Sequence, residues 1–70
     1  MRYGLWINVK NGGYIWGEGA NNVRTLKNRA RNVNASSFIY DHARDVKVWR
    51  RDADGTEAYD DKTYRYLGGK

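Results

Sequence analysis

The stretch RYGLWINVKNGGYIWGE, residues 2–18, decides the fold of this 70-residue chain. Apolar residues alternate with others over residues 2–10, and a half-buried strand requires this period of two. An Asn-Gly-Gly turn follows, and Asn-Gly favours a tight hairpin because its residues adopt positive φ easily. Residues 14–18 then return as a second strand, and Gly17 and Gly19 at its far end permit a bulge or a bend. We therefore expect the chain to begin with a β-hairpin.

A helix is predicted after the hairpin. Asn21 or Asn22 suits its N-cap, since an Asn side chain accepts a hydrogen bond from a backbone amide of the first turn. Apolar residues then recur at spacings of three and four, which places them in one stripe along a helix. Basic residues occupy the opposite side, and the stripe consists of Val23, Leu26, Ala30 and Val33.

The second half of the chain favours further strands. Residues 38–40 suit either a short strand or a helical turn. Residues 46–51 alternate strictly, which predicts that Trp49 shares a face with Lys47 and offers an exposed ring. An Asp-Ala-Asp-Gly turn then leads back into a strand over residues 56–59.

Together these elements predict an α+β fold in a single domain of residues 1–70. The order is β-β-α-β-β, which folds as an antiparallel sheet with one amphipathic helix packed on one face. Residues 63–67 are β-prone enough for one further C-terminal strand, and residues 68–70 form a flexible tail. Three Trp and six Tyr offset the shortage of aliphatic residues, so we expect a largely aromatic core.

Charge is divided unevenly along the chain. Residues 1–34 hold six Lys or Arg against the single acid Glu18, which gives a net charge of +5. Residues 35–70 hold seven bases and seven acids, which gives zero, and those acids are expected to pair with bases on neighbouring strands. This division indicates that one element meets a polyanion or an acidic partner.

The predicted binding surface is the basic side of the helix. The cations on this side of the helix can bind phosphates, and an Asn side chain there can donate hydrogen bonds to phosphates or to base edges. A solvated helix face is the alternative, although such a face usually mixes both signs of charge. Trp6 alternates against the apolar residues of its strand, so we expect it on the open side of the sheet, stacking on unpaired bases or covering a dimer contact. The candidate residues are Arg24, Lys27, Asn28, Arg29 and Arg31, extended by Arg2, Lys10 and Trp6.

Composition argues against several other classes. The chain has no Cys, hence no disulfide or thiolate metal site, and His42 lacks the partners of a zinc site. No apolar run approaches the roughly 18 residues of a membrane span, and no signal segment begins the chain. We therefore expect a cytoplasmic protein that is not an enzyme and has no catalytic residues, metal or cofactor.

Two short motifs precede the basic helix, namely Gly4-Leu5-Trp6 and Tyr14-Ile15-Trp16-Gly17. With that helix they resemble the start of a GIY-YIG nuclease. The resemblance implies metal-dependent cleavage of nucleic acid, for which Glu57 is the available metal-binding glutamate. The chain departs from both motifs, because Trp6 replaces the tyrosine of the first and Trp16 is inserted before the glycine of the second.

The chain is also similar in type to the small accessory proteins of bacteriophages, which implies a location in the cytoplasm of a bacterial host and an inhibitor of that host's nucleoprotein machinery. Our first expectation is a non-enzymatic protein that binds nucleic acid, or a nucleoprotein complex, through the basic helix. The alternative is a protein-binding inhibitor of a host defence complex, of the anti-CRISPR or anti-restriction type. A degenerate GIY-YIG-like nuclease is the third. The sequence leaves open whether the partner is DNA, RNA or protein, and whether two copies form a homodimer.

Overall fold

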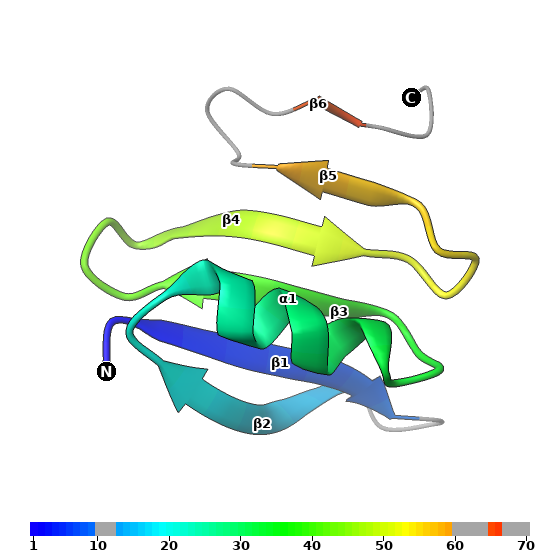
Figure 1. Cartoon of the computed structure of the whole chain (residues 1–70), viewed down its shortest axis with the longest axis horizontal. Coiled ribbons are helices and arrows are strands. Elements are labelled where there is room, and N and C mark those ends of the chain that lie inside the picture. Colours follow the sequence, from blue (N-terminus) through cyan, green and yellow to red (C-terminus); the bar gives the residue numbers. More distant parts are fainter. Residues whose placement is uncertain (10–12, 60–64, 67–70) are drawn as a thin grey trace.

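The computed structural model describes residues 1–9, 13–59 and 65–66, and it confirms the predicted α+β architecture. All neighbouring strands are antiparallel, and they form one sheet in the order β2-β1-β3-β4-β5-β6 (Figure 1). Residues 38–40 belong to a strand rather than to a helical turn. The elements are β1 (Tyr3–Val9), β2 (Gly13–Ala20), α1 (Val23–Arg31), β3 (Ser37–Asp41), β4 (Val46–Arg51), β5 (Glu57–Tyr59) and β6 (Arg65–Tyr66).

Some expectations concern parts of the chain outside the described residues. These are the Asn-Gly of the first turn, the candidate Lys10 and the tail at residues 68–70. The further strand expected within residues 63–67 is present as β6, whose backbone pairs with β5. The Asp-Ala-Asp-Gly turn also forms, with the amide of Gly55 donating to the carbonyl of Asp52 over 2.9 Å.

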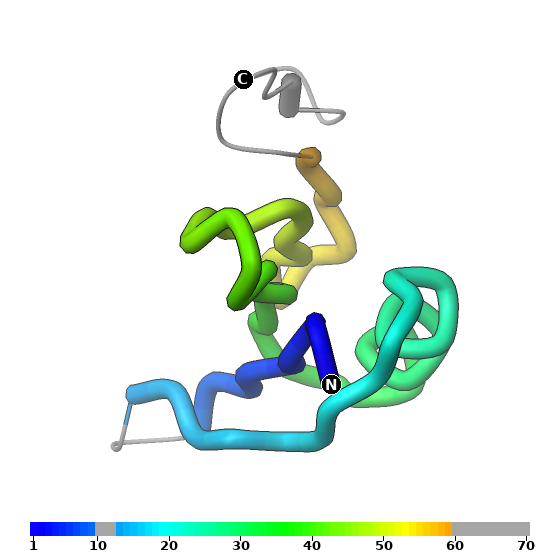
Figure 2. The backbone as a smooth tube through the Cα atoms, turned by 90° about the vertical axis from the view of Figure 1, so that its left-hand side faces the viewer, coloured from blue at the N-terminus to red at the C-terminus, as the bar shows by residue number. Residues whose placement is uncertain are grey.

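The core lies between the sheet and its helix, which covers one face (Figure 2). The apolar stripe of the helix meets the apolar side chains of the strands there, as predicted, because alternate residues of a strand point to one face. Asn22 caps the helix by accepting a hydrogen bond of 2.9 Å from the amide of Thr25. The helix ends at Arg31, so Val33 lies just beyond it and is only half-buried. The largest fully buried apolar residues are Leu5, Leu26, Ile39 and Trp49. The expectation of a largely aromatic core was wrong, because Trp49 is the one aromatic residue among the buried core residues that the structure describes.

A bulge on β2 sets which side chains share a face. The register pairs Leu5 with Glu18 but Trp6 with Trp16, so the extra residue is Gly17, one of the two glycines at which the sequence permits a bulge. The bulge turns Glu18 toward the helix. It also places Trp16 on the opposite face, beside Trp6.

A second bulge, on β4, corrects the strict alternation expected there. Ile39 pairs with Trp49 whereas Tyr40 pairs with Lys47, which leaves Val48 as an extra residue. Lys47 and Trp49 therefore point to opposite faces of the sheet. The expectation of an exposed Trp49 was wrong, since only 1% of its surface is exposed and it packs in the core.

Arg2 and Asp41 tie the start of β1 to the end of β3. The guanidinium of Arg2 donates to both oxygens of the fully buried Asp41, over 3.0 and 2.9 Å. The amides of Ala43 and Arg44 donate to the same carboxylate, which satisfies it in the turn after β3. This hydrogen bonding, mainly that from Arg2, holds the pKa of Asp41 below its ordinary value.

We predict that Asp41→Asn lowers the free energy of unfolding at neutral pH, because the amide keeps an acceptor but loses the charge that Arg2 binds. The folded pKa is lowered, so the stabilisation is complete above the ordinary value of about 3.9 and is lost as the pH falls through the folded value. Urea unfolding of both proteins between neutral pH and about pH 2 measures this. An equal deficit at every pH would contradict it.

Candidate binding surface

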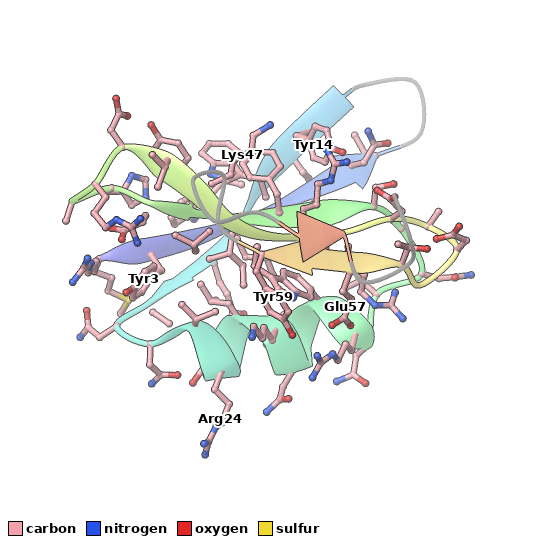
Figure 3. All side chains as sticks on the ribbon, turned by 90° about the horizontal axis from the view of Figure 1, so that it is seen from above. Tyr3, Tyr14, Arg24, Lys47, Glu57 and Tyr59 are labelled. Atoms are coloured by element: carbon pink, nitrogen blue, oxygen red, sulfur yellow. The ribbon has the colours of Figure 1, made fainter. Side chains whose placement is uncertain are left out.

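The face of the sheet opposite α1 carries a cluster of rings. In Figure 3 Tyr14 and Lys47 lie on this side of the sheet, whereas Tyr3, Glu57 and Tyr59 lie on the side of the helix. The rings come from β1, β2, β3 and the residue that follows β3. We call this cluster the aromatic face, and it consists of Trp6, Tyr14, Trp16, Phe38, Tyr40 and His42.

Trp6 is the centre of the aromatic face. Its ring stacks on that of Phe38, with centroids 6.3 Å apart and planes inclined by 19°. Trp16 meets Trp6 edge-on at 5.2 Å, and Tyr14 meets Phe38 at 4.9 Å. Such offset and edge-to-face pairs are favourable beyond their buried area, so the rings hold one another in place.

Two glycines let the indole of Trp16 lie along the sheet. A Cβ at Gly4 would collide with the six-membered ring of Trp16, and a Cβ at Gly19 would come within 3.3 Å of it. Trp16 keeps 48% of its surface exposed and Tyr14 keeps 45%, although both are ordered by their neighbours. The aromatic face thus presents large apolar rings to solvent in a fixed arrangement.

A shallow hollow of about 330 Å³ opens beside Trp6. Its walls are apolar, except that the ammonium of Lys47 lies 4.6 Å from the centroid of Phe38. The bulge on β4 is what brings this cation to the rings. The hollow therefore combines ring surfaces with a positive charge, and it is lined by Trp6, Phe38, Tyr40, His42 and Lys47.

The cations of the basic helix are less available to a ligand than the sequence indicates. Arg29 donates to Glu18 over 2.8 Å, and Arg31 forms a two-pronged pair with Glu57 over 2.8 and 2.7 Å. Arg31 thereby lowers the pKa of Glu57, and Arg51 lies 3.5 Å from the same carboxylate, as the cross-strand pairing predicts. Two of the four helix cations thus already face acids.

The other two helix cations differ from each other. The ammonium of Lys27 lies 4.4 Å from the ring centroid of Tyr59, where a cation–π contact holds it. Arg24 is exposed and points away from the molecule (Figure 3), and no ion pair joins it to an acid among the described residues. Asn28 is exposed beside them, with its carbonyl accepting from Asn32.

The predicted site residues therefore divide between two faces. Trp6 lies on the open side, as expected, but the helix cations lie on the other side of the sheet. Arg2 binds Asp41 instead of flanking Trp6. One flat ligand cannot contact both groups at once, so the two are separate candidate surfaces.

Sequence reasoning missed most of the aromatic face. Phe38 and Tyr40 alternate with the buried Ser37, Ile39 and Asp41, so a strand assignment would have found them. Lys47 carries no such signal, because only the bulge turns it to this face.

The residues that carry the nuclease resemblance do not come together in one site. Glu57 binds Arg31 on the helix side, whereas Trp6 and Trp16, which stand in the two motifs, lie on the opposite face. Among the described residues no three potential ligands gather to hold a metal ion.

In the same part of the chain, α1 is too short to span a membrane. The sequence matches no family model, and no curated protein or solved structure is detectably similar to it.

We predict that Gly4→Ala destabilises the protein by about 1–3 kcal/mol, because the added methyl displaces the indole of Trp16. In a Trp16→Ala background the same substitution should cost much less, since the closest obstacle is gone and the nearest remaining atom is Nε2 of His42, 3.0 Å from the added Cβ. Urea unfolding of the two single variants and the double variant gives the coupling free energy. Equal costs in both backgrounds would show that Gly4 does not seat Trp16.

Proposed function

We propose that this chain is a non-catalytic nucleic-acid-binding protein that binds single strands on its aromatic face. The supporting observation is the set of ordered, partly exposed rings beside Lys47. Unpaired bases stack on such rings, each contributing about 1–3 kcal/mol, whereas bases in a duplex already stack on one another. The net charge of +5 favours approach to any polyanion.

Within this face the rings and the cation have different roles. Tyr14 and Trp16 offer the most exposed ring area and would carry stacking. The ammonium of Lys47 would leave the ring of Phe38 for a phosphate, which is the stronger partner for a cation. We expect preference for single strands over duplex, with little dependence on base sequence.

The basic helix is a second candidate surface for nucleic acid. Arg24 supports it, because its guanidinium is exposed and points into solvent. Arg29 and Arg31 would have to exchange Glu18 and Glu57 for phosphates, so their gain on binding is smaller. A duplex bound there would make few phosphate contacts, so log K would fall only weakly with log salt.

Exposed apolar residues on β2 favour one alternative, a protein-binding inhibitor. Tyr14, Ile15 and Trp16 are each about half exposed, at 45%, 50% and 48%. Two of them are Tyr and Trp, the residue types that are enriched among the energetic hot spots of protein interfaces. A phage-type inhibitor of a host nucleoprotein complex would use this surface. In that case the aromatic variants would abolish capture of a protein partner and leave nucleic-acid binding unaffected.

Anisotropy titrations with short labelled single strands and a matched duplex, across a salt series, test the proposal. Trp16→Ala should weaken single-strand binding by about tenfold, and Lys47→Ala should reduce the slope of log K against log salt by about 0.7. Arg24→Glu is the matched control on the opposite face, and it should leave single-strand affinity almost unchanged.

Loss of binding in Arg24→Glu with full binding in Trp16→Ala would move the site to the helix. Absence of binding by the wild-type protein at physiological salt would reject the proposal. Circular dichroism of each variant establishes that it is folded before its affinity is interpreted.

A further inference from the structure

β2 is an edge strand with apolar side chains on both of its sides. Among the described residues it pairs with β1 alone, so no other described strand lies beside its outer backbone groups. Tyr14 and Trp16 lie on the aromatic face, whereas Ile15 pairs with Ile7 on the helix side, where 50% of it is exposed. Edge strands of native proteins usually carry charges or prolines that prevent pairing with another chain. The outer segment of β2, residues 13–17, has neither.

Charge does not prevent pairing of two copies at this edge. Each chain carries +5, so two copies repel each other least where the surfaces that meet carry no cations. Residues 13–17 are uncharged, and the next residue, Glu18, is bound to Arg29 of its own chain. Two such edges therefore meet without repulsion between like charges.

We propose that β2 pairs antiparallel with β2 of a second copy, about a two-fold axis at Ile15. This register is self-complementary, because it sets Ile15 against Ile15 and Trp16 of each copy against Tyr14 of the other. Cross-strand aromatic pairs are among the favourable contacts between strands. The bulge at Gly17 ends the regular segment symmetrically on both sides.

The dimer has a definite shape. A two-fold axis that relates antiparallel strands of one sheet runs perpendicular to the sheet, so both copies keep the same face on the same side. The two aromatic faces thus join into one surface, and both α1 helices lie behind it. Tyr14 and Trp16, at the margin of the face in one copy, become its centre in the dimer.

The strength of this association is limited by its size. A standard protein interface buries about 800 Å² on each partner. An eight-residue strand with three large exposed side chains supplies only part of such an area. We therefore expect a dimer that dissociates in the micromolar range and does not require nucleic acid.

Sedimentation velocity of the full chain over a concentration series, without nucleic acid, tests the proposal. The wild type should shift from monomer to dimer, and Ile15→Lys should weaken the dimer by about tenfold or more, because two buried apolar side chains become charged. Ile15 is outside the aromatic face, so this variant leaves the proposed rings intact. Ala53→Lys is the control, since it adds the same charge in an exposed turn between β4 and β5, which is away from β2 in the sheet order.

Amide hydrogen exchange gives a second readout that locates the interface. Amides of β2 should become more protected as the protein concentration rises, while those of β5 should not change. A wild type that stays monomeric up to about 1 mM would overturn the proposal and leave the edge to a strand from another protein. A dimer that persists in Ile15→Lys would also overturn it, by placing the interface elsewhere.

Discussion

In the part of the chain that the structure describes, a single helix covers one face of the sheet and leaves the other face open. The nine residues of α1 cover a single face, and that face receives the aliphatic core together with Trp49. The other face has no layer of its own among the described residues, so its rings cover it by packing on one another around Trp6. Rings that cover an open face remain partly exposed. The same arrangement that completes the fold therefore creates the candidate binding surface.

Two bulges decide which residues share that surface. Without the bulge at Gly17, Trp16 would turn away from Trp6, and without the bulge at Val48, Lys47 would lie on the side of Trp49. Each bulge changes the face of every residue that follows it, because side chains alternate strictly elsewhere. The position of one extra residue in each strand thus joins the rings to their cation.

Local patterns predicted the hairpin, the helix with Asn22 as its cap, and the strand order along the chain, because each depends on neighbouring residues. The long-range ion pairs were not predictable in this way. Arg2 binds Asp41 and Arg31 binds Glu57, so bases of the first half meet acids of the second. The uneven charge of the sequence is therefore partly cancelled in space, and the basic helix becomes a weaker candidate than its composition indicated. The sequence placed Trp49 on the wrong face of the sheet for a related reason, since no local pattern identifies Val48 as the extra residue of β4.

We propose that single-stranded nucleic acid binds the open face of the sheet. A ¹H–¹⁵N correlation spectrum of the protein, recorded during titration with a short single-stranded oligonucleotide, tests this. We expect shift changes at the indole N–H groups of Trp6 and Trp16 and at the amides of β3, with the amides of α1 and the buried indole of Trp49 unchanged. Changes confined to α1 around Arg24 would contradict it, as would a spectrum that the oligonucleotide leaves unaltered.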